Sequence, residues 1–408
     1  MAAEHSTLRT RATDERGAVL IQVGVAILVL TAFAMFVIDY GLLSVSRSQA
    51  QTAADAGALA GATALALDDF ADRTATGPAK VAARSFALAN NVWDAAPDVQ
   101  MAADVRFYPD APAAFPASCA SDDCIRVDVH RTQARGNPLP MFLGFLVGLT
   151  NQGIRATATA RAAPANASDC LKPWAIADKW EEHNPVVGPW DPSQTFNPTG
   201  ATPDVYTPPS QYSNGTSFTL ANDIGVKLAL KVGSPGDAIN PGWFQAVDLT
   251  CPAGGGGGGS CYRDNISGCS GATWKIGDDL PKENGNMIGP TNQGVGDLVA
   301  LDPTAEWDPT TKKVIKSCIG PPYTCSKSGY TTSPRLAAVA VFDLAQYMAT
   351  GGPGNGTVHI VNILGFFVEK MDKKDVVGYL ATKPDVKVSN GGGVQNSASF
   401  IKAIQLVR

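Results

Sequence analysis

Cysteines are the residues of this 408-residue chain whose number and spacing most clearly predict chemistry, and that chemistry is disulfide formation. There are eight: Cys119, Cys124, Cys170, Cys251, Cys261, Cys269, Cys318 and Cys325. Their number is even, and all of them follow a long apolar stretch, which is typical of a compartment that permits disulfides. Short loop closure favours the pairs Cys119–Cys124, Cys251–Cys261 and Cys318–Cys325, with Cys170–Cys269 as the long-range pair, although spacing alone does not fix the connectivity.

The sequence offers little for metal or cofactor binding. It contains no Cys-x-x-Cys pair, and its four histidines are far apart: His5, His130, His183 and His359. Structural zinc sites combine cysteines and histidines at short spacings, so we expect no metal site. The six glycines at 254–259 precede no Gly-Lys-Ser/Thr, which a phosphate-binding loop would need, and we interpret them as a loop tip. We therefore expect no bound cofactor.

Catalytic motifs are also missing from the sequence. There is neither a Gly-x-Ser-x-Gly nucleophile turn nor a His-Glu-x-x-His helix. Gly268-Cys269-Ser270-Gly271 resembles a nucleophile turn, but a disulfide partner explains Cys269 better. Charged residues make up only 17% of the chain and the net charge is −5, which disfavours a nucleic-acid-binding surface. We predict no catalytic residue and no nucleic-acid partner.

The elements that must position the cysteines begin with residues 18–38, AVLIQVGVAILVLTAFAMFVI, which carry no charge. At a rise of about 1.5 Å per residue they form a helix of about 31 Å, the thickness of a bilayer's hydrocarbon core. Three arginines precede this stretch, which predicts a transmembrane helix with residues 1–17 in the cytoplasm. The alternative is a signal peptide cleaved after Ala32-Phe33-Ala34, but Met35–Ile38 continue the apolar stretch past that site.

An Ala-rich helix is expected to continue this stretch to about residue 67. Between Ala50 and Ala66, eleven of seventeen residues are Ala or Gly, and no proline occurs before Pro78. Small residues at three- and four-residue spacing form one stripe, which we predict to be a helix-packing surface: Ala53, Ala56, Gly57, Ala60, Gly61 and Ala64. The stripe can pack against partner helices or against the protein's own sheet, and the sequence does not separate these alternatives.

A family resemblance rests on the order of motifs along these helices. They are Arg16-Gly17-Ala18-Val19, the apolar stretch, Asp39-Tyr40-Gly41, Arg47, Gln49 and Gln51-Thr52-Ala53-Ala54-Asp55-Ala56-Gly57-Ala58-Leu59-Ala60-Gly61. This order resembles the N-terminal signature of TadE/TadG-like Flp (Tad) pilus-assembly proteins. Prepilin-like members carry Glu where this chain has Gln22, which implies that Gly17 is not a cleavage site and that the helix stays a membrane anchor.

The remainder of the chain predicts an α+β fold. The expected elements are a helix at 80–91, strands at 99–108, 125–131 and 154–162, a short core helix at 140–149, and, after a linker at 163–168, strands at 226–232, 336–342, 358–368, 376–380 and 400–407. We assign residues 39–168 to the stalk helix and a small pilin-like α+β unit, and residues 169–408 to a β-rich periplasmic domain with long loops. This second part also resembles TadG-like proteins, and it lacks the Asp-x-Ser-x-Ser loop of members with a von Willebrand A domain.

The resemblance implies a non-enzymatic, membrane-anchored component of Flp/Tad pilus assembly or the related secretion apparatus, acting through helix and domain contacts. It implies a single-pass protein of the bacterial inner membrane with most of its chain in the periplasm. The expected partners are pilus-assembly or pseudopilin-like proteins, and self-association is a further expectation. The alternative function is a membrane-tethered exported hydrolase or ligand-binding envelope protein, which would need a pocket with convergent titratable groups.

Overall fold

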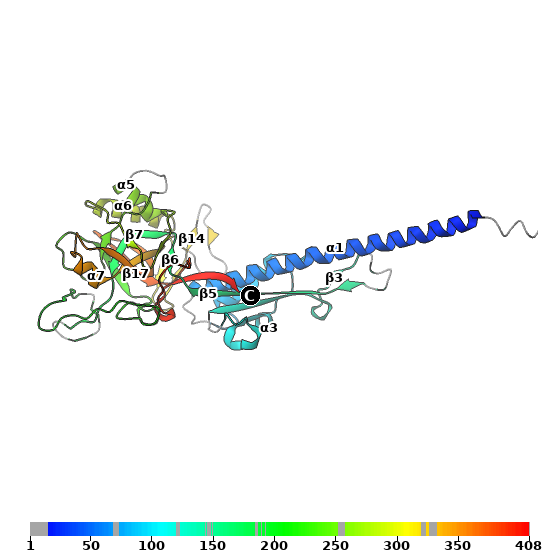
Figure 1. Ribbon diagram of the computed structural model, residues 1–408, viewed down its shortest axis with the longest axis horizontal. Helices are drawn as coiled ribbons and strands as arrows, with labels where there is room; N and C mark the ends of the chain where they lie inside the picture. Colours follow the sequence, from blue (N-terminus) through cyan, green and yellow to red (C-terminus); the bar gives the residue numbers. More distant parts are fainter. Residues whose placement is uncertain are drawn as a thin grey trace, which may run out of the picture. The chain divides into compact units, whose positions relative to one another are not determined.

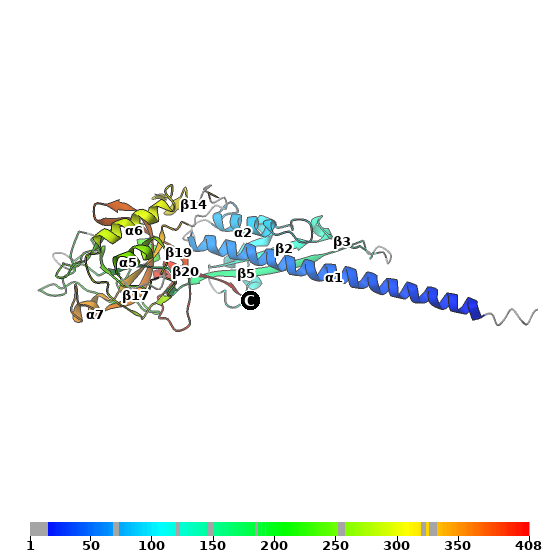
Figure 2. The ribbon, with the colours of Figure 1, turned by 90° about the horizontal axis from the view of Figure 1, so that it is seen from above.

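The longest element of the computed structural model is helix α1 (Glu15–Leu67), shown in blue in Figures 1 and 2. The structure describes residues 15–407 apart from 68–72, 120–122, 143, 145–147, 149, 184–186, 189, 192, 252–257, 320–323 and 326–332. Alanine has the highest helix propensity, and α1 contains no proline. The uncharged stretch and the Ala-rich stretch therefore form one continuous helix, as expected.

A five-stranded sheet has the strand order β1-β2-β5-β20-β19. Its strands are β1 (Val105–Phe107), β2 (Cys124–Arg131), β5 (Ile154–Pro164), β20 (Ile401–Val407) and β19 (Lys383–Asp385). Strand β20, shown in red, is antiparallel to β5, with Val407 opposite Thr159 and Lys402 opposite Pro164 (Figure 2). The last strand of the chain therefore completes a sheet that begins before residue 168.

A larger mixed sheet has the order β11-β17-β16-β7-β9-β8-β18, and β18 also pairs with β17. The strands are β11 (Asp279–Leu280), β17 (Val358–Asp372), β16 (Leu336–Phe342), β7 (Leu171–Ala177), β9 (Trp243–Ala246), β8 (Lys227–Val232) and β18 (Asp375–Ala381). Because β18 returns to β17, six of these strands form a closed ring. Closure leaves β11 as the one strand of this sheet outside the ring and removes edges that would otherwise be open to pairing.

Both faces of strand β16 are buried, and its side chains alternate between two hydrophobic cores. Ala338, Ala340 and Phe342 belong to one hydrophobic core, and Val339 and Val341 belong to the other. The second core takes side chains from all six strands of the ring and from helices α5 (Gly259–Ser267) and α6 (Ile288–Ala300). A strand buried on both faces is apolar throughout, and LAAVAVF fits that requirement.

The remaining helices and paired strands are shorter. They are α2 (Pro78–Ala89), α3 (Met101–Asp104), α4 (Leu220–Asp223), α7 (Leu344–Ala349), and the paired strands β3 (Leu139–Pro140) with β4 (Asn151–Gln152), β6 (Ala167–Ser168) with β10 (Trp274–Lys275), β12 (Glu306–Asp308) with β13 (Lys313–Ile315), and β14 (Cys318–Ile319) with β15 (Thr324–Cys325).

The predicted α+β class is confirmed, and so are the strands at 226–232, 336–342, 358–368, 376–380 and 400–407. The strand predicted at 99–108 is wrong in its first half, because Met101–Asp104 is helical. The core helix predicted at 140–149 is wrong at its start, where Pro140 ends β3 and Phe142 is 53% exposed. The rest of that segment lies outside the described residues except for Gly144 and Gly148.

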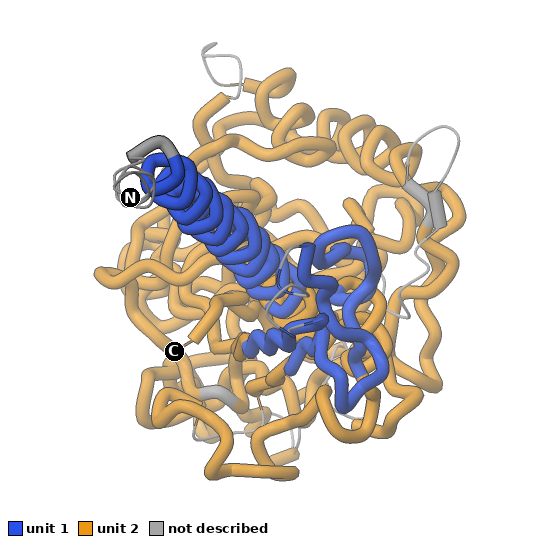
Figure 3. Tube along the Cα trace, turned by 90° about the vertical axis from the view of Figure 1, so that its right-hand side faces the viewer, with its two compact units in different colours: residues 1–54, 87–99, 128–157 blue, residues 55–86, 100–127, 158–408 orange. Residues whose placement is uncertain are grey.

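The chain divides into two compact units, which Figure 3 shows in different colours. The first contains residues 1–54, 87–99 and 128–157, and the second contains residues 55–86, 100–127 and 158–408. Both units therefore take residues from α1. The assignment of residues 39–168 and 169–408 to separate domains stays a prediction.

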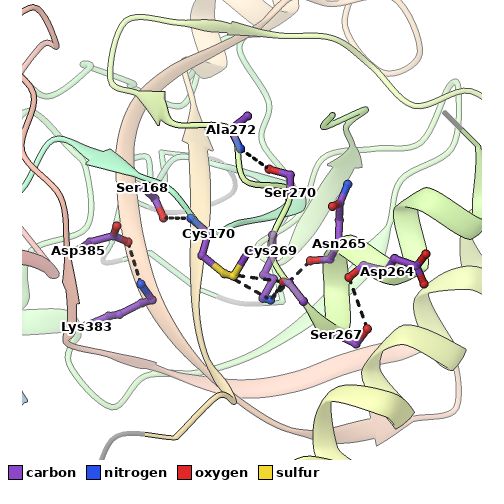
Figure 4. The surroundings of a disulfide bond; sticks show 12 residues. Ser168, Cys170, Asp264, Asn265, Ser267, Cys269, Ser270, Ala272, Lys383 and Asp385 are labelled. Carbon is purple, nitrogen blue, oxygen red and sulfur yellow. Dashed lines mark hydrogen bonds and ion pairs between the residues drawn. A yellow bond between two sulfur atoms is a disulfide. The ribbon is translucent and has the colours of Figure 1, made fainter. Parts of the chain in front are cut away.

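A disulfide and the side chain of Lys172 hold the C-terminal end of helix α5 to strand β7. The disulfide Cys170–Cys269 joins the residue before β7 to the residue after Gly268 (Figure 4). The Lys172 amine donates to the carbonyl oxygens of Gly268 at 2.6 Å and Asn265 at 3.5 Å. A cation at a helix C-terminus interacts favourably with the unpaired carbonyls there. Lys172 is nevertheless only 3% exposed, and burial, together with the nearby Lys383, lowers its pKa to about 7.

The lowered pKa of Lys172 predicts a pH-dependent stability. Between about pH 7 and its ordinary value of 10.5, the unfolded chain binds this proton more strongly than the folded chain, so the free energy of unfolding should increase with pH. Lys172→Met should remove that increase. Urea unfolding of each full chain in detergent, repeated from neutral to alkaline pH, measures how steeply the free energy of unfolding increases with pH. Exposed Lys374→Met serves as the control, and equal slopes in all three proteins would contradict the prediction.

Candidate functional site

Helix α1 changes its surroundings at Asp39. Residues 17–34 are exposed throughout, and the helix is long and apolar enough to cross a membrane. From Asp39 onwards one face is buried, at Asp39, Leu42, Ser46 and Ala50, which recur at three- and four-residue spacing. The protein therefore begins to cover α1 at the residue that follows the uncharged stretch.

Polar side chains of α1 hold two other parts of the first unit, residues 87–99 and 128–157, which we call the juxtamembrane segments. Each bond joins one side chain of the helix to a backbone group of a segment. The bonds are Phe142 N–H to Asp39 Oδ1 at 2.9 Å, Trp93 N–H to Gln49 Oε1 at 2.6 Å, and Gln51 Nε2–H to Thr157 O at 3.1 Å. All three helix residues belong to the motif order recognised in the sequence, but the sequence did not reveal what they bind.

Arg131 joins the two juxtamembrane segments to each other. This side chain, 3% exposed, donates to the carbonyl oxygens of Val92 and Ala95 in one segment and of Asn137 and Pro138 in the other. Burial lowers the pKa of the guanidinium, while the nearby Asp94 carboxylate acts in the opposite direction. Arginine suits this position because its rigid fork of donors can satisfy several carbonyls at once.

Aromatic side chains gather around the end of the uncharged stretch. On α1, the rings of Phe36 and Tyr40 stack with centroids 5.9 Å apart. On the juxtamembrane segments, the rings of Trp93 and Phe142 meet edge to face at 6.0 Å. Trp93 also has a φ of 62°, a left-handed conformation that is unusual for a bulky residue. All four side chains remain partly or largely exposed.

The small-residue stripe of α1 is largely covered by the chain itself. Ala53, Gly57, Ala60, Gly61 and Ala64 are buried, and Ala56 is half-buried. A Cβ added to Gly61 would lie 2.7 Å from the Ile125 side chain on β2 and 3.0 Å from Ala83 on α2. Of the two alternatives that the sequence left open, the contacts of Gly61 correspond to packing within the protein's own fold.

Three pairs of cysteines form disulfides in the structure: Cys119–Cys124, Cys170–Cys269 and Cys251–Cys261. Cys119–Cys124 and Cys251–Cys261 are pairs that short loop closure favoured, and Cys170–Cys269 is the expected long-range pair. Cys318 and Cys325 lie opposite each other in the antiparallel pair β14–β15, while their side chains lie outside the described part of the chain. Opposed residues in such a pair have Cα atoms about 4.5–5.5 Å apart, within the range that a disulfide bridges. The fourth pair stays a prediction.

The carboxyl of Asp178, directly after β7 in the second unit, is completely buried. Burial raises its pKa to about 7, although four donors act against that rise: Ser217 O–H at 2.7 Å, Lys179 N–H at 2.8 Å, Tyr206 O–H at 3.2 Å and the backbone N–H of Phe218. These bonds fasten the loops that carry Tyr206 and Ser217 to the end of β7. Among the described residues, no three His, Cys, Asp or Glu side chains are placed to hold a metal ion.

Asp39→Ala should release the hairpin that carries Phe142, because the Phe142 N–H loses its acceptor. We expect faster amide hydrogen exchange in the peptide covering residues 141–150 of the full chain in detergent. Asp39→Asn keeps an acceptor oxygen and should show a smaller increase. Ser44→Ala, on the uncovered face of the same helix, is the control. Unchanged exchange in Asp39→Ala would show that this bond does not hold the hairpin.

Gly61→Leu should destabilise the protein, because the new side chain has no room beside Ile125 and Ala83. Overpacking of this kind costs about 1–3 kcal/mol, or more for a large side chain. Gly41 lies on the same helix with open space around it, so Gly41→Leu is a matched control. Thermal unfolding in detergent should show a lower Tm for Gly61→Leu alone. An unchanged Tm would mean that the stripe is free to bind a partner.

Comparison with known protein families identifies the N-terminal helix. Residues 17–64 match the family model described as putative Flp pilus-assembly TadE/G-like. The match contains the apolar stretch, the small-residue stripe and all three helix residues that bind the juxtamembrane segments. It confirms the resemblance for this part of the chain, and the resemblance of residues 169–408 stays a prediction. No curated protein and no solved structure matches the chain.

Proposed function

Since residues 17–64 match a pilus-assembly family, we propose that this chain is a membrane-anchored, non-enzymatic component of Flp/Tad pilus assembly. The family match carries the proposal. The matched residues include the part of α1 that could cross the membrane and most of the part after Asp39, where the rest of the chain packs on the helix. The task of such a segment would be to fix residues 39–408, here called the body, at the membrane surface, where the body contacts other assembly proteins.

The orientation that we propose places residues 1–17 in the cytoplasm and the body in the periplasm. Three arginines precede the uncharged stretch, and positive residues favour the cytoplasmic side. Three disulfides form in the body, and disulfides persist in oxidising compartments such as the periplasm. These two independent observations support the same orientation.

A function through protein contacts agrees with the structural role of the buried polar residues of the body. Asp178 and Lys172, whose pKa values differ strongly from the ordinary ones, are buried and hydrogen-bonded to neighbouring loops or helix ends. Such groups fasten structure, because a buried polar atom without a partner would destabilise the fold. Partners would meet the exposed surfaces of the body and of α1. Pilus-assembly or pseudopilin-like proteins, and further copies of the chain, are the partners we propose.

Deletion of the gene in its host should abolish surface pili, as counted by electron microscopy. The full chain should restore them. A chain whose residues 1–38 are replaced by a cleavable signal peptide should not, because its body is no longer anchored. The matched control replaces residues 18–38 with an unrelated uncharged apolar helix of the same length, which preserves anchoring.

A reporter that is active only in the periplasm, fused after Ser48, checks the orientation in the same strains. Unchanged pili after deletion would contradict the pilus function. Full restoration by the released body would contradict the need for an anchor, and an inactive reporter would contradict the orientation.

A further inference from the structure

An apolar hairpin lies beside the end of the uncharged helical stretch. Residues 137–153 carry no charge, and residues 140–149 read PMFLGFLVGL. Strands β3 and β4 bracket this segment, and Met141 N–H donates to Thr150 O at 3.3 Å. At its first turn Phe142 is 53% exposed. Trp93 is 37% exposed and its ring meets that of Phe142, and exposed apolar side chains that cluster in this way normally mark a contact surface.

The level of this hairpin along α1 is fixed by Asp39. The Phe142 N–H lies 2.9 Å from Asp39 Oδ1, and Asp39 directly follows the stretch 18–38 that fits a hydrocarbon core. When that stretch spans a bilayer, Phe142 must lie within a few ångströms of the boundary between hydrocarbon and headgroups. The hairpin is therefore placed where lipid is the nearest apolar surface.

Trp93 is brought to the same place by a costly backbone conformation. Its left-handed φ of 62° is disfavoured for a bulky residue, and three contacts hold it. Gln49 accepts its N–H, Arg131 binds the carbonyl of the preceding Val92, and the Phe142 ring packs against its indole. Strain that the surroundings enforce is a reason to look for a function. The enforced result is a half-exposed indole beside an exposed phenyl ring.

We propose that Trp93, Met141 and Phe142 form a second membrane contact, which enters the headgroup region of the bilayer next to α1. The proposal rests on the membrane anchoring proposed above. Tryptophan and other amphipathic aromatics favour this region, because the ring is apolar while the indole N–H can still bind water or headgroups. The absence of charge from residues 137–153 removes the main obstacle to entry.

A second contact would change what the anchor does. One helix fixes the distance of the first unit from the bilayer but leaves this unit free to tilt about the helix end. Trp93, Met141 and Phe142 would restrict the tilt by entering the headgroups beside that helix, since the same unit then touches the membrane at a second point. The first unit would thereby keep a constant direction relative to the membrane.

The test places a photoreactive benzoylphenylalanine at one position of the full chain, in vesicles of phosphatidylethanolamine and phosphatidylglycerol that contain a fluorescent phospholipid. The test position is Phe142, whose backbone bond to Asp39 is unaffected by the side chain. Leu28, exposed within the uncharged stretch, is the positive control. Tyr212, which is 81% exposed on a loop of the other unit, reports background collisions. Lipid attached to the chain is measured after irradiation.

We expect Phe142 to acquire lipid several-fold above Tyr212 and at a level comparable to Leu28. If Leu28 acquires lipid and Phe142 stays at the level of Tyr212, the second contact is wrong while the anchor stands. If Phe142 instead cross-links to another copy of the chain, the hairpin is a protein interface and the proposal is again overturned. If Leu28 acquires no lipid, both the anchor and this inference fail.

Discussion

A carboxylate is poorly tolerated in hydrocarbon, and Asp39 therefore sets the boundary on which the arrangement of the first unit depends. In the uncharged stretch before it, α1 satisfies its own backbone, and the Thr31 hydroxyl finds its partner within the helix by donating to Ile27 O. After it, the same helix is covered by its own chain. Asp39 lies where the exposed part of α1 meets the covered part, and its carboxylate accepts a hydrogen bond from the Phe142 N–H. Gln49 and Gln51 continue this attachment along the next turns.

Small residues let the covered part of α1 serve as a packing element of the body. At Gly61 the helix approaches α2 and β2 so closely that even a methyl group would collide. The five-stranded sheet is in turn completed by β20, from the end of the chain. The helix end and the C-terminal strand therefore meet in one fold, although more than three hundred residues separate them in sequence. This sheet therefore depends on residues from distant parts of the chain.

The six-stranded ring is held together by the pairing of its own strands, and the long loops connect those strands. Both faces of β16 are buried, and the ring closes through β17 and β18. Covalent links then fasten the irregular parts: Cys170–Cys269 ties the end of α5 to β7, and Cys251–Cys261 closes the Gly-rich loop. In the chain-entropy model such links stabilise by restricting the unfolded chain, most strongly for the longest loop. Lys172 adds a polar contact at the same helix end.

What the sequence by itself determined are the features encoded by neighbouring residues. Absence of charge over 18–38, alanine content up to residue 67, and apolar runs such as 336–342 each specify an element through local hydropathy or propensity. Short loop closure likewise favoured the near cysteine pairs. The strands β7 and β9, the pairing of β20 with β5, and the hairpin at Phe142 were decided only by tertiary structure, as were the partners of Asp39, Gln49, Gln51 and Arg131. The physical reason is that periodicity shows which face of an element is apolar or polar, whereas the group that covers that face comes from distant parts of the chain.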